Sequence, residues 1–256
     1  MSTFRVLQFN MQFAQGWATD EPHHGEINLE ATLAEIRSHD ADLIFLQEVE
    51  RALANGSQLN PPPNYTRLRA GLDHPYGCFA YPKADERELP FGVGLAILSR
   101  TPLHDEMRLN LPSPGIAFEF DGRKTTPTDR LLLGTKTTIQ GREVLLLNTH
   151  LLAFFMLGTS SSVHPQQREM IAGQLAASHR PTLLAGDFNV RKHGDLMAQY
   201  ASHGYRTVQD QEVTWRRQPY VLDHIFYNES FRVVSHSVKA TSASDHHVLV
   251  ADFEFV

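Results

Sequence analysis

Asp187 and Asn189 are the two side chains whose types and spacing first suggest chemistry in this sequence. They follow an apolar run of strand length, residues 182–185, that ends at a glycine in the segment PTLLAGDFNV. A carboxylate and an amide at the end of a buried strand suit metal-assisted chemistry on a phosphate. The same pattern is also typical of an ordinary strand and turn, so one such segment does not identify a site.

Five other apolar runs have polar residues at one end, and this recurrence favours a site. The runs over residues 4–9, 43–46 and 144–147 are followed by polar residues, whereas those over residues 225–227 and 248–250 are preceded by them. The flanking residues are Asn10, Gln47, Glu48, Asn148, Thr149, His150, Asp223, His224, Asp245, His246 and His247. Because the start of an antiparallel strand lies beside the end of its neighbour, we expect the six polar clusters to converge on one edge.

Taken in order, these motifs resemble those of the endonuclease/exonuclease/phosphatase superfamily. They are Asn10, QEV, NTHL, GDFN, LDHIF and SDHH, and they extend from near the first residue to near the last. The resemblance implies an α/β, deoxyribonuclease-like sandwich of four layers, with two mixed β-sheets face to face and helices outside. One departure concerns the helix after NTHL, which in many relatives carries Arg and, three residues later, Gln; here Arg168 is followed by Ile171.

Three residues are expected to hold a divalent cation. A carboxylate at the end of an apolar strand, such as that of Glu48, is costly unless it is paired or coordinated, and hard cations prefer carboxylate oxygens. The resemblance places Asn10 and Asp245 near Glu48, with magnesium (Mg2+) as the default ion and manganese (Mn2+) as a substitute. Asp245 is equally well suited to orienting a histidine.

The remaining site residues are expected to move protons and bind the phosphate. Asp187 is expected to orient and deprotonate the attacking water, while Asn189 holds that water or a phosphate oxygen. The resemblance implies that His246 contacts the phosphate and is held by Asp223, a pairing that keeps the imidazole partly cationic. His150 then touches the phosphate or protonates the leaving oxygen, and the roles of the two histidines can be exchanged.

Composition is that of an ordinary globular protein. The 256 residues are 41% hydrophobic and 20% charged, and no linker divides them, so one domain over residues 1–256 is expected. The 23 Lys and Arg against 29 Asp and Glu give a formal charge of −6, which disfavours a broad basic face for nucleic acid. A local basic groove would still allow a nuclease, and its candidates are Arg67, Arg69, Arg100, Arg123, Lys124, Arg216 and Arg217.

The most apolar stretch, LLAFFMLG, begins at Leu151 and ends at Gly158. We expect a short helix or loop that covers the core; exposure of the whole stretch would instead favour a lipid-like substrate or peripheral lipid contact. Cys78 is the single cysteine, so no intrachain disulfide is expected. The sequence shows neither a signal peptide nor an apolar run long enough to cross a bilayer, and a cytoplasmic protein is expected.

Secondary structure is expected to alternate between helices and strands. The expected helices cover residues 28–39, 165–179 and 195–204, with caps at Asn28 and Asp195, and further expected strands include residues 131–139, 142–147 and 213–215. Residues 12–28, with His23 and His24 at the surface, are expected to form a loop over the site. Side-chain alternation directs His224 and His247 away from the site.

We therefore expect a magnesium-dependent phosphoesterase that acts on a small or lipid-like phosphodiester or monoester. An endonuclease or exonuclease is the close alternative, since nothing in the sequence identifies the substrate. A catalytically inactive binding module on the same fold is the alternative from another class. Such a module is expected to have lost at least one of Glu48, Asp187 and His246, and all three are present.

Overall fold

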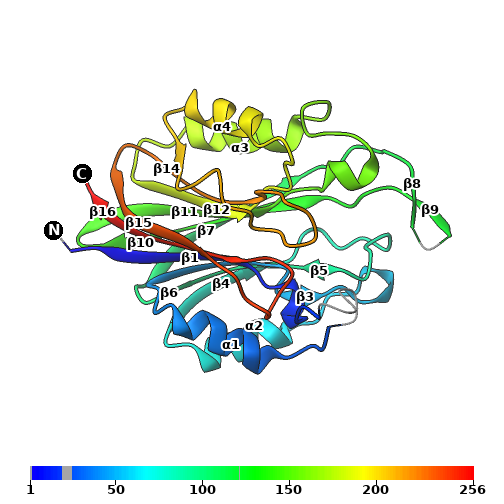
Figure 1. The fold of residues 1–256 in the computed structure, drawn as a ribbon, viewed down its shortest axis with the longest axis horizontal. Helices are drawn as coiled ribbons and strands as arrows, with labels where there is room; N and C mark the ends of the chain where they lie inside the picture. The colour runs from blue at the N-terminus through cyan, green and yellow to red at the C-terminus, as the bar shows by residue number, and fades with distance from the viewer. Residues whose placement is uncertain (1, 19–24, 121) are drawn as a thin grey trace.

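The computed structural model describes residues 2–18, 25–120 and 122–256, and within them two six-stranded β-sheets pack face to face (Figure 1). The first sheet has the order β15-β16-β1-β2-β6-β4, formed by β1 (Phe4–Asn10), β2 (Leu43–Gln47), β4 (Tyr76–Ala80), β6 (Leu95–Ser99), β15 (Phe231–Lys239) and β16 (Val248–Phe255). The second has the order β13-β14-β12-β11-β10-β7, formed by β7 (Leu103–Leu111), β10 (Arg130–Ile139), β11 (Arg142–His150), β12 (Thr182–Asp187), β13 (Arg206–Thr207) and β14 (Asp223–Tyr227). The α/β sandwich expected from the sequence is confirmed.

Helices cover the outer faces of both sheets (Figure 1). In the described residues, α1 (Leu29–Ser38) and α2 (Pro63–Gly71) lie on the first sheet, and α3 (Gln166–Ala176) and α4 (Gly194–Ala201) on the second. Shorter elements are the 3-10 helices η1 (Gln12–Ala14), η2 (Ala54–Gly56) and η3 (Phe154–Leu157) and the strand pairs β3 (Glu50–Arg51) with β5 (Gly92–Val93) and β8 (Phe118–Phe120) with β9 (Arg123–Thr125).

The expected helix caps are half confirmed. Asn28 caps α1 as expected, because its Oδ1 accepts a hydrogen bond from the Ala31 amide at 3.0 Å. Asp195 does not cap α4: the N-cap position is His193, and Asp195 lies in the first turn. The Asp195 carboxylate instead accepts a hydrogen bond from Ser162 Oγ at 2.7 Å, so it joins the helix to the segment before α3.

Each sheet contains one parallel pair of strands that is joined through a helix. The pairs are β1 with β2, joined through α1, and β11 with β12, joined through α3. Parallel strands end at the same edge of their sheet, and the register places Asn10 opposite Gln47 and His150 opposite Asp187. The two parallel pairs therefore deliver polar side chains side by side.

The core between the sheets becomes polar toward the edge that carries these residues. Along β1, Phe4 and Val6 belong to the apolar core, and the next positions on the same face are Gln8 and Asn10. The same change occurs along β2 (Leu43, Phe45, Gln47), β11 (Val144, Leu146, Asn148, His150), β12 (Leu183, Ala185, Asp187) and β14 (Ile225, Asp223). One end of the inter-sheet core is thus a layer of buried polar side chains.

Two other faces are packed by separate apolar clusters. Leu33 and Ile36 of α1 pack on the outer face of the first sheet, and Ile171 and Leu175 of α3 pack on the outer face of the second. The stretch LLAFFMLG contributes Leu151 to the second of these clusters and forms η3, as expected for a segment that covers the core. Among the described residues, no helix is long and apolar enough to cross a membrane.

Residues 213–215 do not form the expected strand. Trp215 makes only single β-bridges, to Tyr220 and to His246, within a loop before β14. This loop is held by the buried Thr214 hydroxyl, which accepts hydrogen bonds from the amides of Leu222 and Asp223 at 3.0 and 3.1 Å. The segment therefore forms a loop although its residue types favour a strand. His23 and His24, expected at the surface, lie outside the described residues.

Candidate active site

Asp187 lies at the point where the ends of the two parallel pairs meet. Asn10 Nδ2 donates hydrogen bonds to Asp187 Oδ2 at 3.1 Å and to Glu48 Oε1 at 3.0 Å, so an amide of the first sheet joins the two carboxylates. His150 Nε2 lies 3.5 Å from Asp187 Oδ2 and 3.8 Å from Glu48 Oε1. Four of the expected site residues are thus brought together across the sheet boundary.

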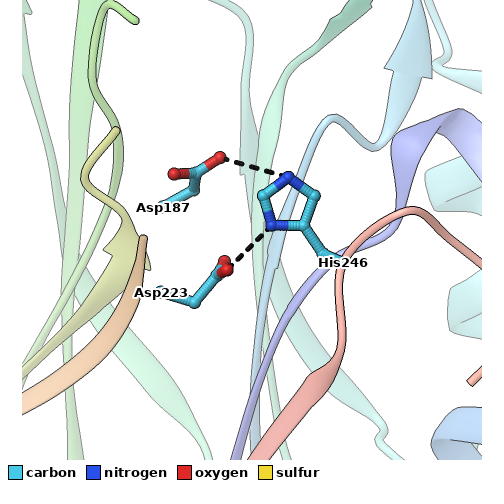
Figure 2. A group of neighbouring side chains, drawn as sticks. All are labelled: Asp187, Asp223 and His246. Carbon is cyan, nitrogen blue, oxygen red and sulfur yellow. Dashed lines mark hydrogen bonds and ion pairs between the residues drawn. The ribbon is translucent and has the colours of Figure 1, made fainter. Parts of the chain in front are cut away.

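Asp223 and His246 complete the cluster (Figure 2). His246 Nδ1 donates to Asp223 Oδ2 at 2.8 Å, and His246 Nε2 lies 3.7 Å from Asp187 Oδ2. All three side chains are at least 94% buried. The imidazole is therefore held between two carboxylates, and the nearer one, Asp223, fixes its orientation, as the family resemblance implies.

Burial changes the acidity of both carboxylates beside Asn10. Burial and then the nearby charge of Asp223 raise the pKa of Asp187 to about 8, and burial and then Asp245 raise the pKa of Glu48 to about 7. Each carboxylate therefore pays a desolvation penalty that the surrounding side chains do not fully offset. A divalent cation held at Glu48 would lower both pKa values through its charge, so the donor set fits a hard cation.

The two histidines of the site differ in charge. Burial would lower the pKa of His246, but the negative charges of Asp223 and Asp187 raise it to about 10. Burial, with Arg130 and His246 nearby, lowers the pKa of His150 well below its usual range. At neutral pH His246 is therefore a cation and His150 is neutral.

This charge difference decides which residues suit a metal. Asp187, Asp223 and His246 offer ligand atoms that all lie within 4.8 Å of one another, which is close enough for a metal ion. A protonated imidazole with a carboxylate at each nitrogen has no free lone pair, so we interpret this trio as a proton-handling group. The oxygens of Asn10 and Glu48 are the better donors for a hard cation.

Asp245 lies beside the cluster but is engaged with other groups. Its Oδ2 accepts hydrogen bonds from Trp215 Nε1 at 3.1 Å and from Arg217 Nε at 2.5 Å. It is nevertheless close enough to Glu48 to raise the pKa of that carboxyl. Its side chain thus orients an indole and a guanidinium, and its two expected roles, as a metal ligand or as the group that orients a histidine, stay predictions.

Asn189 supports Asp187 through its backbone. The Asn189 amide N–H donates to Asp187 Oδ1 at 3.0 Å, while its side-chain Nδ2 donates to the Leu151 carbonyl at 3.0 Å. The side chain thus ties the loop after β12 to the loop after β11. Asn189 has a φ of 50°, in the left-handed region that asparagine tolerates better than most residues.

Glu48 also has a left-handed backbone, with a φ of 50°, and this turn brings its side chain against Gly92. A Cβ at Gly92 would lie 2.2 Å from Glu48 Cβ and 2.3 Å from Glu48 Oε2. Only glycine therefore fits opposite Glu48 without displacing it. A similar constraint applies at Gly186, where a Cβ would lie 2.2 Å from the Thr149 carbonyl oxygen of the neighbouring strand.

Three buried amides connect the site to both sheets, and we call them the amide relay: Gln8, Gln47 and Asn148. Gln8 Nε2 donates to Asp223 Oδ1 at 2.9 Å and to Gln47 Oε1 at 2.7 Å. Gln47 Nε2 then donates to Asn148 Oδ1 at 2.8 Å, and Asn148 Nδ2 donates to the carbonyls of Leu46 and Ala96, each at 2.9 Å. The relay fixes Asp223 relative to the first sheet.

Sequence reasoning did not assign a function to the relay residues. Gln8 and Asn148 lie two residues before the polar residues that end β1 and β11, and Gln47 is the last residue of β2. All three are fully buried. The signal was available, because positions i and i+2 of a strand share a face: Gln8 shares the face of Asn10, and Asn148 that of His150. What the sequence did not reveal is which amide pairs with which.

Helix α3 carries a buried amide despite the departure noted at Arg168. Gln167 Oε1 accepts a hydrogen bond from the Leu152 amide at 3.2 Å, and its Nε2 donates to Ser113 Oγ at 3.0 Å. The loop that follows His150 is therefore braced from α3. The bracing amide precedes Arg168 instead of following it by three residues.

The seven basic residues considered for a nuclease groove do not form one continuous groove. Arg67 pairs with Glu30, and Arg100 pairs with Asp40 and Asp42. Arg100 follows Ser99, which is paired with Leu43 at the start of β2, so it lies at the edge opposite Glu48. Arg216 and Arg217 lie beside the site, where Arg217 bonds to Asp245.

Comparison with known proteins agrees with the fold and with the motifs. The model of the Endonuclease/Exonuclease/phosphatase family matches residues 7–246, so the chain belongs to this family. Among curated proteins, a UPF0294 protein of Yersinia pseudotuberculosis is similar, with 31% identity over 140 residues. That alignment spans about half of each protein, 52% of this chain and 52% of the relative.

Solved structures show the same fold over the full chain. An endonuclease/exonuclease/phosphatase from Beutenbergia cavernae is similar with a TM-score of 0.72 and 21% identity, covering 100% of this chain and 72% of that one. ANGEL2, a 2′,3′-cyclic phosphatase solved with adenosine-2′,3′-vanadate, is similar with a TM-score of 0.66 and 16% identity, covering 99% and 96%. At these identities the similarity concerns the fold.

Proposed function

We propose that this protein is a divalent-metal-dependent phosphoesterase that hydrolyses a small phosphodiester or phosphomonoester by in-line attack of water. One observation carries the proposal: the Asp187 carboxylate lies between the Asn10–Glu48 pair and the Asp223–His246 pair. The family supports the reaction class, since its description names nucleases and phosphatases. The cyclic phosphatase ANGEL2 supports the same class.

Asp187 is proposed to accept the proton of the attacking water. Its two oxygens are held by the Asn10 side chain and the Asn189 backbone amide, so the carboxylate is oriented before substrate arrives. General bases act best when their pKa lies near the working pH, and burial has moved that of Asp187 to about 8. Glu48 and Asn10 would hold the cation, with Asp245 as a further candidate and Mg2+ or Mn2+ as the ion. A bound divalent cation supplies charge neutralisation on the phosphoryl oxygens.

His246 is proposed to bind the phosphate as a cation. Asp223 accepts the hydrogen bond of Nδ1 and so holds the ring. The N–H of Nε2, 3.7 Å from Asp187, is then available to donate to a phosphate oxygen. His150, neutral and 13% exposed, is proposed to donate a hydrogen bond to the phosphate or to the leaving oxygen. The two histidines are thus assigned different roles by charge.

The proposal is tested by measuring hydrolysis of bis-p-nitrophenyl phosphate, p-nitrophenyl phosphate and supercoiled plasmid in parallel, with Mg2+, with Mn2+ and with chelator. We expect metal-dependent turnover of a small ester that is lost in Asp187→Asn. The matched control is Asp195→Asn, the same change in the first turn of α4, which should leave turnover intact.

Other outcomes would contradict the proposal in distinct ways. Turnover that persists in chelator would remove the metal from the mechanism. Nicking of plasmid at low enzyme, without hydrolysis of either small ester, would favour the nuclease. Failure on all three substrates, with or without metal, would favour a binding module on this fold.

A further inference from the structure

Three aromatic rings gather beside His246, and we call them the aromatic wall: Phe155, Trp215 and Tyr220. Their centroids are 5.7 Å apart for Phe155 and Trp215, 5.6 Å for Phe155 and Tyr220, and 6.0 Å for Trp215 and Tyr220. All three rings are partly exposed. They come from η3 and from the loop before β14, so segments far apart in the sequence meet here.

The aromatic wall lies directly beside His246. The Trp215 ring lies 6.3 Å from the His246 ring, and Trp215 forms a backbone bridge with His246. The Trp215 indole N–H donates to Asp245, which fixes the plane of the ring. A group esterified to a phosphate held at His246 would therefore reach this wall without any rearrangement of the loop.

Cationic side chains border the aromatic surface. The Arg191 guanidinium lies over the Tyr220 ring, 5.9 Å from its centroid. Arg216 and Arg217 lie over the neighbouring Trp17 ring at 5.3 and 5.1 Å. A lipid tail would be best bound by a continuous apolar surface, whereas guanidinium groups beside partly exposed rings suit a planar polar ring joined to an anion.

We propose that the aromatic wall binds the nucleobase of a nucleotide-derived phosphoester; this inference rests on the proposed phosphoesterase function. A base offers a π-face to the rings and polar edges to the guanidinium groups. The formal charge of −6 and the scattered basic residues disfavour a long duplex. The substrate is therefore a nucleotide ester or a short single strand.

The test compares two diesters that share a leaving group and a charge: thymidine 5′-(p-nitrophenyl phosphate) and methyl p-nitrophenyl phosphate. We expect the wild-type protein to favour the nucleoside ester by about tenfold or more in kcat/KM, mainly through KM, the range expected for stacking of one base. The double variant Phe155→Leu/Tyr220→Leu should lose this preference and keep its rate on the methyl ester within about twofold. Met156→Ala is the control, because this residue lies beside the wall and is 66% exposed. It should change neither the preference for the nucleoside ester nor the rate on the methyl ester.

Equal kcat/KM for the two esters in the wild-type protein would overturn the inference and leave the proposed function intact. A preference that survives in the double variant would also overturn it. Faster turnover of sphingomyelin or lysophosphatidylcholine micelles than of the nucleoside ester would assign the surface to lipid instead.

A binding measurement keeps the inference testable if neither ester is hydrolysed. Both tryptophans of the chain, Trp17 and Trp215, lie at this surface, so quenching of intrinsic fluorescence reports on it. In Asp187→Asn we expect thymidine 5′-monophosphate to bind about tenfold or more tightly than deoxyribose 5-phosphate, since only the former carries a base. Equal affinities would overturn the inference.

Discussion

The two parallel strand pairs have the same topology but deliver different chemistry. β1 and β2 are joined through α1; β1 ends in the amide Asn10, and β2 is followed directly by the carboxylate Glu48. β11 and β12, joined through α3, end in an imidazole and a carboxylate, His150 and Asp187. Strand topology thus sets where the side chains lie, and residue type sets what each pair does.

The difference indicates a division of labour. The first pair carries only oxygen and amide groups, which suit a hard cation. The second pair lies beside the cationic His246 and is suited to proton transfer and phosphate binding. The two carboxylates share one donor, Asn10 Nδ2, so neither pair forms a site alone.

The largest effect is expected when either carboxylate is neutralised. Glu48→Gln and Asp187→Asn should each lower kcat by about 1,000-fold, within the range of general base and metal effects. The rate losses of groups that act as one unit are not additive. The kcat of the double variant should therefore lie within about tenfold of that of the less active single variant. Steady-state kinetics on p-nitrophenyl esters would check this. Multiplicative losses would show that the two pairs act independently.

Gly92→Ala is expected to damage the first pair without touching the second. The added Cβ would collide with Glu48, so we expect metal affinity to fall by about tenfold while Asp187 keeps its place. Titration of activity with Mg2+ measures the effect as a higher metal concentration at half-maximal rate. Gly115→Ala is the control, because a Cβ there meets nothing within 4 Å. An unchanged metal requirement would contradict the assigned role of Glu48.

Gln8→Leu should weaken the link between the two pairs. Asp223 Oδ1 and Gln47 Oε1 would each lose a buried donor, and such losses cost about 1 to 3 kcal/mol in the free energy of unfolding. We expect kcat to fall by about tenfold as His246 loses its fixed partner. Gln58→Leu, an exposed amide, is the control in chemical denaturation. A Gln8→Leu variant as stable as the wild type would contradict the structural role assigned to the amide relay.

The smallest effect is a change in the pH dependence of stability in chelator. Burial raises the pKa of Glu48 to about 7 and that of Asp187 to about 8, so the folded state binds protons more tightly than the unfolded chain. Stability must then fall as pH rises from about 4.5 to 8. Glu48→Gln/Asp187→Asn should lack this part of the slope and be more stable than the wild type by at least about 1 kcal/mol at pH 8. Excess Mg2+ should remove the difference.

The strands and the convergence of the polar clusters could be predicted because they depend on local patterns. An apolar run that ends in a polar residue marks both a buried strand and its exit, as in β1 with Asn10 and β12 with Asp187. The same local pattern predicted a strand over residues 213–215, and this prediction was wrong. Val213 and Trp215 are strand-forming types, but a buried hydroxyl at Thr214 holds this segment as a loop.

Features that depend on distant contacts could not be predicted. The relay bonds of Gln8 to Asp223 and of Gln47 to Asn148 cross from one sheet to the other, over 215 and 101 positions of sequence. The different charges of His150 and His246 depend on which carboxylates surround each ring after folding. The partners of Asp245 also come from a loop whose path the sequence does not reveal.

The amide relay has a consequence for behaviour in salt. Dissolved ions screen charges beyond about 8 Å at physiological ionic strength, but they hardly affect hydrogen bonds between neutral amides in a buried layer. The spacing of the catalytic groups should therefore be the same in dilute buffer and in concentrated salt. The proposed capture of an anionic ester by His246 depends on charge, so added salt should raise KM and leave kcat nearly constant. Under the proposed function, charge would attract the substrate, whereas buried hydrogen bonds between neutral groups keep the geometry of the site.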